Sequence, residues 1–190
     1  KEGENLCIGF LSDCIDEAYA PGADGLTAGV IGLLCDLLYD PYLQDGLFCA
    51  AYVEGERGNL IDRIAALKND PRSWAPRRLN EIMCENEDYG KSALGTIEQA
   101  ERITSEPLYA AYRRALSEAQ VELFYCGTMM PDEVEARFMA TPLAQPREGT
   151  LYQPHTIVQV RPVGDVREVV EDAEVTQGKL SLGFRTGGAS

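Results

Sequence analysis

The sequence lacks several features that define familiar protein classes. It contains one histidine, and its six cysteines include no C-x-x-C pair, so it lacks the closely spaced thiolates of a zinc ribbon. No stretch approaches the roughly 20 apolar residues that cross a bilayer, and no signal peptide is visible. Nothing fits G-x-x-x-x-G-K-S/T or a glycine fingerprint between a strand and a helix. These absences argue against a zinc ribbon, a membrane-spanning helix and a phosphate-binding loop.

Basic residues are scarce relative to acidic ones. The 17 lysines and arginines are outnumbered by 31 acidic residues, which gives a formal net charge of −14. Because phosphate backbones and anionic membranes attract lysine and arginine, this balance argues against a nucleic-acid partner and a membrane partner. A basic peptide or basic protein surface is a suitable partner, since long-range steering follows the sign of the field. Alternatively, the charge simply keeps a cytoplasmic protein soluble.

The rest of the composition is that of a folded protein. The chain has 190 residues, of which 45% are apolar and 25% charged, enough for a hydrophobic core. Its cysteines lie partly inside apolar runs, which predicts reduced, buried thiols in a cytoplasmic protein. They are Cys7, Cys14, Cys35, Cys49, Cys84 and Cys126.

The sequence pattern predicts an α/β chain with a helix-rich middle. Apolar periodicity and capping residues predict helices over residues 26–38, from Asp45 or Gly46 to 68, from Pro71, from Ile97, over 106–117 and after Pro131. The first of these is apolar enough to be deeply buried. Strand patterns occupy residues 5–12, 121–126, 156–160, 168–170 and 180–184, and a proline-rich linker lies between them at 141–155.

Few residues stand out as catalytic candidates. His155 lies in the linker without a nucleophile elbow and is interpreted as structural or merely exposed. Gly29 and Gly32 lie inside an apolar helix, which favours close helix packing. The acidic run at residues 85–88 lacks the spacing of a calcium loop, so a solvated loop is favoured over a weak cation site. Glu56, Asp62 and their neighbours are typical of a solvated helix face.

Several short motifs follow one another in a recognisable order. They are residues 52–57 (YVEGER), 60–64 (LIDRI), 69–71 (NDP), 87–90 (EDYG) and 124–127 (FYCG). Over roughly residues 1–145 this order resembles the insulinase/pitrilysin-type zinc peptidase family, in particular bacterial members that lack the zinc site and are encoded beside an active paralogue. The run at 87–90 resembles the P-Y-G turn of that family, with Asp88 where proline is usual.

The resemblance also places the zinc ligands of active family members. These members use an inverted H-x-x-E-H helix and a glutamate that ends an E-R-x-x-x-x-x-E pattern. Glu56-Arg57 matches the opening of that pattern, so the ligand falls on position 63, which is Arg63. A guanidinium has no lone pair for a metal, and Asp62 points about 100° away on a helix. We therefore expect no catalytic residue, no metal site and no bound cofactor in this chain.

The resemblance implies two α/β (α+β) domains, each a mostly antiparallel sheet covered by helices. Residues 1–70 would end a first insulinase-like domain, residues 71–146 would form a second, inactive one, and residues 147–190 would be a linker and the first strand of a following half. We expect the sequence to be part of a longer protein. An incomplete domain exposes apolar surface, so we also expect some self-association.

The implied function is a supporting one. In this family a zinc-bearing half and a zinc-free half enclose a peptide, which is captured by strand addition to a sheet edge. The resemblance implies a cytoplasmic, non-catalytic half that binds an extended peptide and partners an active zinc peptidase paralogue or a second half of the same chain. One alternative is a scaffold module without a peptidase role. Another is a metallopeptidase with an unfamiliar site, whose activity a chelator would abolish.

Overall fold

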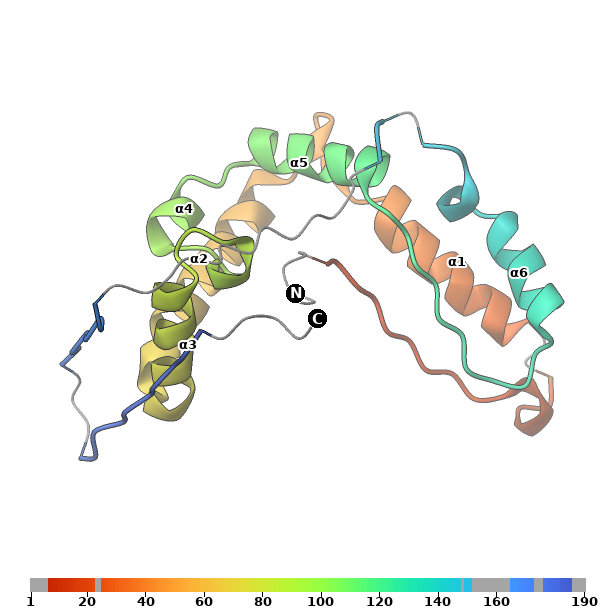
Figure 1. Cartoon of the computed structure of the whole chain (residues 1–190). Helices are drawn as coiled ribbons and strands as arrows, with labels where there is room; N and C mark the ends of the chain where they lie inside the picture. Colours follow the sequence, from red (N-terminus) through yellow and green to blue (C-terminus); the bar gives the residue numbers. More distant parts are fainter. Residues whose placement is uncertain (1–6, 23–24, 148, 152–164, 173–175, 186–190) are drawn as a thin grey trace. The chain divides into compact units, whose positions relative to one another are not determined.

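The computed structural model describes residues 7–22, 25–147, 149–151, 165–172 and 176–185 (Figure 1). This part of the chain is mostly helical and includes a two-stranded antiparallel sheet, which confirms the predicted α/β (α+β) class. No helix within these ranges is long and apolar enough to cross a bilayer. The chain divides into two compact units, each built from separate stretches. Unit 1 is Lys1–Cys7, Glu54–Ile103 and Pro154–Ser190, and unit 2 is Ile8–Val53 and Thr104–Gln153. The division into insulinase-like domains at residues 70 and 146 stays a prediction.

Unit 2 contains two groups of packed elements, α1 with α6 and η4, and α5 with a short hairpin. Helix α1 contacts α6 and the 3-10 turn η4, while α5 packs against strand β2. The elements of this unit are η1 (Glu17–Tyr19), α1 (Leu26–Tyr39), β1 (Leu43–Gln44), β2 (Leu47–Phe48), α5 (Ser105–Glu118), α6 (Pro131–Met139) and η4 (Pro142–Ala144). The predicted helices over 106–117 and after Pro131 are confirmed.

The hairpin occupies residues where the sequence pattern predicts the start of a helix. Strands β1 and β2 pair antiparallel across Asp45 and Gly46. These two residues have φ angles of 53° and 78°, the left-handed conformation that a type I′ turn requires at both positions. Asp-Gly is a strong hairpin signal, so the helical interpretation from Asp45 onward is wrong because Phe48 belongs to a strand. The next helix, α2, begins at Ala50.

An aromatic cluster joins the hairpin to α5. The ring of Phe48 meets those of Tyr109 and Tyr112 edge-on, with centroids 5.4 and 5.2 Å apart. The Tyr112 hydroxyl donates a hydrogen bond to the carbonyl oxygen of Leu38 at 2.6 Å. Desolvation at this place raises the pKa of Tyr112 above its ordinary value. The cluster therefore ties the end of α1 to α5 and β2.

Helix α1 is less buried than its apolar composition predicts. Within this helix Ile31 and Cys35 are buried, but Leu33 is more than half exposed. A side chain added at Gly29 or Gly32 would meet no other atom within 4 Å. The predictions of deep burial and of close helix packing at these glycines are therefore wrong for the described structure.

Unit 1 is built from helices whose ends are set by local capping residues. Its elements are α2 (Ala50–Ala66, from Glu54 onward), η2 (Leu67–Asn69), α3 (Pro71–Met83), η3 (Asp88–Gly90) and α4 (Ile97–Glu101). Asp70 accepts a hydrogen bond from the backbone N–H of Arg72 at 3.1 Å, directly before Pro71. Thr96 and Gln99 form a reciprocal capping box, with bonds of 3.3 and 3.0 Å. Both predicted helix starts are confirmed.

The longer predicted strands do not form ladders. No strand pairing is found in the described structure at four of the predicted places, residues 7–12, 121–126, 168–170 and 180–184. The fifth, residues 156–160, lies outside the described residues. A strand pattern indicates which residues can pair, but a ladder needs a second edge for the backbone N–H and C=O groups. The strand predictions at these four places are therefore wrong for the described residues.

Cys14, Cys35, Cys49 and Cys126 are free thiols. Cys35 and Cys84 are buried as predicted, but Cys7, Cys14 and Cys126 are exposed. The prediction of buried thiols is wrong for these three because they lie on segments that pack into neither a helix nor a sheet.

Candidate functional site

The first candidate site is the face of α2 on which the resemblance places a zinc ligand. Because α2 is a continuous helix, residues three, four and seven positions apart share one face. An open hollow of about 540 Å³ lies along this face. Its lining consists of Glu56, Asn59, Leu60, Asp62 and Arg63.

The charges in this hollow do not suit a zinc ion. Glu56 and Asp62 offer two carboxylates, while Arg63 places a guanidinium beside Asp62, about two turns beyond Glu56. Glu56, Asp62 and Arg63 are all exposed. Over the described ranges, no three His, Cys, Asp or Glu side chains gather closely enough to hold a metal ion. His155 lies outside those ranges.

Arg57, the second residue of the E-R pair, has a structural role. Its guanidinium donates to the carbonyl oxygen of Ile103 at 3.2 Å and to the Glu54 carboxylate at 3.4 Å. The side chain therefore ties α2 to the end of the α4 segment. Of the pair, Glu56 alone lines the hollow.

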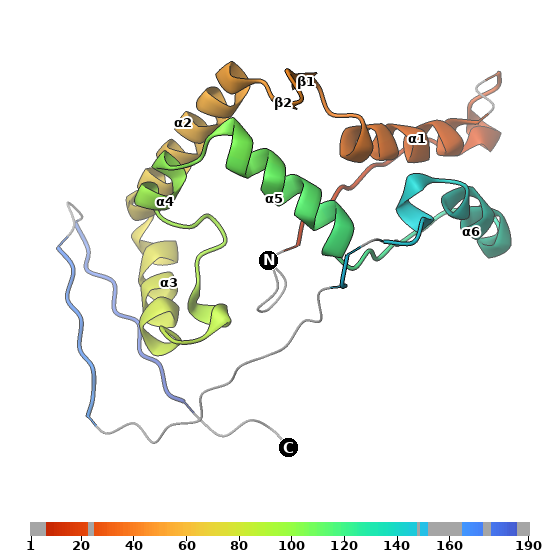
Figure 2. The same cartoon turned by 90° about the horizontal axis from the view of Figure 1, so that it is seen from above.

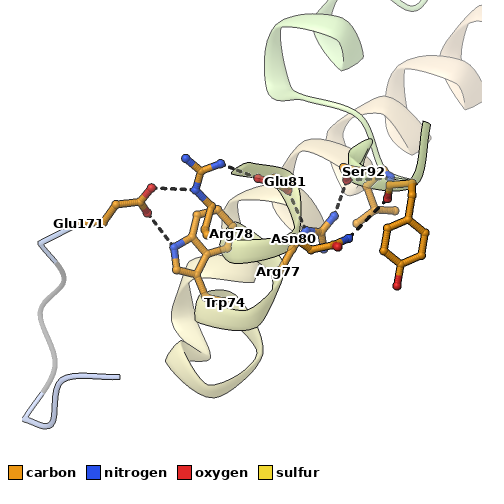
Figure 3. A network of polar contacts seen from close by, with 9 residues as sticks. Trp74, Arg77, Arg78, Asn80, Glu81, Ser92 and Glu171 are labelled. Carbon is orange, nitrogen blue, oxygen red and sulfur yellow. Dashed lines mark hydrogen bonds and ion pairs between the residues drawn. The ribbon is translucent and has the colours of Figure 1, made fainter. Parts of the chain in front are cut away.

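A second candidate is a network of polar side chains on α3 that the sequence analysis did not predict (Figure 3). The Trp74 indole N–H donates to one oxygen of Glu171 at 2.9 Å, and Arg78 Nε donates to the other at 2.7 Å. Arg78 also donates to Glu81 at 2.6 Å. Lys68 Nζ and the Arg78 guanidinium lie 5.6 and 5.8 Å from the Trp74 ring, within cation–π range.

These contacts perturb the ionisation of both charged partners. Hydrogen bonds from Arg78 and then Trp74 lower the pKa of Glu171 below its ordinary value, against a smaller opposing effect of burial. Hydrogen bonds to Glu81 and Glu171 raise the pKa of Arg78. The network therefore keeps Glu171 ionised and fixes this end of the segment 165–172 to Trp74 and Arg78 of α3.

A small open pocket of about 220 Å³ lies at the other end of α3. Its lining consists of Arg77, Asn80, Glu81, Tyr89, Gly90, Lys91, Ser92 and Ala93. Arg77 donates to Glu81 at 3.3 Å and to the Ser92 hydroxyl (Figure 3). Lys91 pairs with Asp88 at 2.5 Å. Both cations of the pocket form ion pairs with carboxylates, Arg77 with Glu81 and Lys91 with Asp88. We therefore interpret this pocket as a structural contact between α3 and η3.

The acidic run at residues 85–88 is not the solvated loop that its local sequence favours. Glu87 is only 5% exposed, and the Arg185 guanidinium donates to it at 2.5 Å. Arg167 donates to both oxygens of Glu85, at 2.9 and 3.2 Å. The two arginines lie 82 and 98 residues further along the chain than their partners. The local sequence pattern therefore could not predict this pairing.

The same two arginines complete the C-terminal end of α3. Arg185 donates to the carbonyl oxygen of Met83 at 2.9 Å, and Arg167 reaches that of Ile82 at 3.4 Å. The last carbonyls of a helix have no partner within the helix, and the negative end of its dipole favours cations. One feature of the sequence could have indicated these contacts. Arg167 directly precedes the predicted strand 168–170, and Arg185 directly follows the predicted strand 180–184.

Comparison with known proteins gives two similarities. No family model matches the sequence. The chain is 30% identical over 187 residues to "Probable inactive metalloprotease YmfF" of Bacillus subtilis (strain 168), a match that covers 98% of this chain and 43% of that protein. It also resembles the solved structure "Crystal structure of a conserved protein from Enterococcus faecalis V583", with a TM-score of 0.63 and 24% identity over 74% of this chain and 34% of that chain. The chain thus spans less than half the length of either relative.

The two similarities carry different weight. The first supports a metalloprotease-like relationship in which the relative is described as inactive. The second, at 24% identity, shows a shared fold alone. The insulinase/pitrilysin subtype stays a prediction from the motifs.

Proposed function

We propose that this chain is a non-catalytic, insulinase-type part of a metalloprotease-like protein, one wall of a cradle that encloses an extended peptide. The observation that carries the proposal is Arg63, which stands where the resemblance requires a carboxylate ligand for zinc. The similarity to a protein described as a probable inactive metalloprotease supports it.

The chemistry of the α2 face fits such a role. Glu56, Asn59 and Arg63 present a carboxylate, an amide and a guanidinium to an open hollow. These groups accept and donate hydrogen bonds to a peptide, but a guanidinium cannot act as a Lewis acid or ligate one. The face can therefore bind and orient a peptide without activating water.

Hydrolysis in this proposal belongs to a partner. An active zinc peptidase paralogue, or a second half of the same polypeptide, supplies the metal, and the assembly works in the cytoplasm. The net charge of −14 favours basic peptides as ligands. Their affinity for the assembly should then fall as salt rises, because screening weakens attraction between exposed charges.

Zinc affinity of the purified chain is the first test. We expect no binding at micromolar zinc for the wild type. Arg63→Glu, which restores the carboxylate of the family pattern, is the matched variant and should also bind no zinc, because the histidines are missing. One tightly held zinc per wild-type chain, or peptide hydrolysis that a chelator abolishes, would refute the proposal.

Activity of the assembly is the second test. A zinc-bearing paralogue should cleave extended peptides faster with this chain bound than without it. A paralogue that binds the chain but cleaves equally well without it would indicate a scaffold instead.

A further inference from the structure

Trp74 and Arg78, one turn apart on α3, form a two-point binding site for a carboxylate. The Trp74 indole N–H and Arg78 Nε donate to different oxygens of Glu171, at 2.9 and 2.7 Å (Figure 3). Lys68 Nζ lies 5.6 Å from the centre of the Trp74 ring and adds a further positive charge. Because two donors are aimed at two oxygens, the site recognises the shape of a carboxylate as well as its charge.

A second site, for a guanidinium, lies just beyond the other end of α3. Arg167 donates to both oxygens of Glu85, at 2.9 and 3.2 Å, a bidentate geometry that lysine cannot form. The same guanidinium reaches the carbonyl oxygen of Ile82 at 3.4 Å, in the last turn of the helix, where free carbonyls favour a cation. This site therefore favours arginine over lysine.

The spacing of the two sites matches an extended chain. Residues 165–172 run alongside α3 in the opposite direction, within unit 1, and reach both sites with side chains four residues apart (Figure 2). Four extended residues span about 13 Å, at roughly 3.3 Å each. The nine residues from the middle of the Trp74–Arg78 pair to Glu85 span a similar length, at about 1.5 Å each. This surface from Trp74 to Glu85, here named the α3 face, therefore recognises arginine followed four residues later by glutamate.

The segment that occupies the α3 face is held like a ligand rather than packed into a core. All eight of its residues are exposed, and Val166, Val169 and Val170 are 95, 52 and 80% exposed. Within the described residues, no backbone-to-backbone hydrogen bond joins it to another segment. The side chains of its ion pairs are 33–55% exposed. Two side-chain anchors therefore hold the segment, and solvent screens both.

We propose that the α3 face is a docking site for a partner protein that presents arginine four residues before glutamate on an extended segment, and that residues 165–172 cover it as a tethered competitor. Charge complementarity selects this partner, since the face offers a carboxylate at one site and a guanidinium with an indole N–H at the other. The inference goes beyond the proposed role of the α2 face, because recognition here uses side-chain charges on a helix and needs no strand pairing.

The strength of the anchors sets how strongly the cover competes. A partly exposed ion pair changes an equilibrium by at most about fivefold, so two well-separated pairs contribute at most about 25-fold. A covered face therefore binds a partner at most about 25-fold more weakly than an open one. The cover weakens docking but does not abolish it.

The first experiment measures binding of the free octapeptide DVREVVED with blocked ends, the sequence of residues 165–172, to the full chain. Arg167→Ala with Glu171→Ala removes both anchors of the cover and opens the face. Trp74 emission reports binding, because Trp74 is the only tryptophan of the chain and the octapeptide has none. We expect a shift to the blue, with an affinity about five- to 25-fold higher for the double variant than for the wild type.

Matched controls separate recognition from general attraction between charges. Glu168→Ala with Lys179→Ala removes the same two charges from exposed side chains that form no ion pair with α3 in the described structure, and should bind like the wild type. The peptide DRVEVVED keeps the composition but loses the four-residue spacing, so it should bind the double variant about fivefold more weakly. Arg78→Met in the double variant should weaken binding of the octapeptide by a similar factor.

The results that would overturn the inference are distinct from one another. Equal affinity of the wild type and the double variant would show that residues 165–172 do not compete for the face. Equal affinity of the two peptides, or no change in emission of the double variant at millimolar octapeptide, would show that the face does not recognise the pattern. Self-association of the wild type that the double variant lacks, measured by sedimentation, would assign the face to a second copy. None of these results concerns the α2 face, so the proposed function is tested separately.

Discussion

The attachment of residues 165–172 to α3 through Glu171 can be tested with a single substitution, Glu171→Gln. The wild-type carboxylate accepts hydrogen bonds from Trp74 at 2.9 Å and from Arg78 at 2.7 Å. The side chains of Glu171 and Arg78 are 37 and 33% exposed, so solvent screens the pair. Partly exposed pairs of this kind contribute at most about 1 kcal/mol, which is roughly a fivefold change in the ratio of attached to detached segment 165–172.

Trp74 makes the measurement direct because it is the only tryptophan of the chain. Glu171→Gln should shift its emission to the red, as the indole loses its carboxylate partner and is exposed to water. Glu168→Gln, at an exposed residue of the same segment that forms no ion pair with a described cation, is the matched control and should leave the emission unchanged.

The pH dependence has a definite sign. The pKa of Glu171 lies below its ordinary value of 4.5 because Arg78 and Trp74 bind the ionised form. The contribution of Glu171 is therefore fully present above about pH 4.5 and is lost as the pH falls through the lowered pKa. Wild-type Trp74 emission should show a transition below pH 4.5 that Glu171→Gln lacks. Equal emission and equal titration of the wild type and Glu171→Gln would refute this account of how Glu171 holds its segment on α3.

Three further predictions concern the stability of unit 1, each checked by chemical unfolding. Gly90→Ala should lower the free energy of unfolding by about 1–3 kcal/mol, because a side chain there would meet the backbone just after α3. Gly58→Ala, where an added side chain on α2 meets nothing, should instead raise it by about 0.5–1 kcal/mol. Equal effects of the two substitutions would contradict the geometry. Arg185→Ala should cost about 2 kcal/mol, since it takes the guanidinium from the buried Glu87 carboxylate, and Arg185→Lys should recover part of that loss. Thr96→Ala should cost about 1 kcal/mol, whereas Thr96→Ser should cost almost nothing, and a similar loss in both would exclude capping as the cause.

Features set by neighbouring residues could be predicted from the sequence. Asp70-Pro71 and the Thr96 capping box start helices because each satisfies backbone groups within three residues. The Asp45-Gly46 turn was equally local, and it was missed because Phe48 was assigned to the apolar face of a helix. The assignment of Arg63 to the zinc-ligand position follows from the spacing after Glu56 in the resembled family, and it stays a prediction.

Features that depend on distant partners could not be predicted. The acidic run at 85–88 has the composition of a solvated loop, yet Glu87 is buried by an arginine 98 residues away. The predicted strand segments have the residues that favour strands, but they form no ladder in the described structure. A ladder needs a second segment to pair the backbone groups, and the composition of one segment does not indicate that partner. The Trp74 network likewise joins residues that are 97 positions apart.

The exposed apolar side chains and the unpaired strand patterns are two aspects of one property. Among the described residues, the buried apolar side chains are Ile31, Cys35, Val53, Cys84 and Ala100, whereas Phe10, Phe124 and Phe184 lie open on extended segments. Folding of each unit fixes helices by capping and ion pairs and leaves the residues of highest β-propensity facing solvent. Such surface gains free energy only when another chain or segment covers it, at roughly 25 cal/mol per Å² of apolar area.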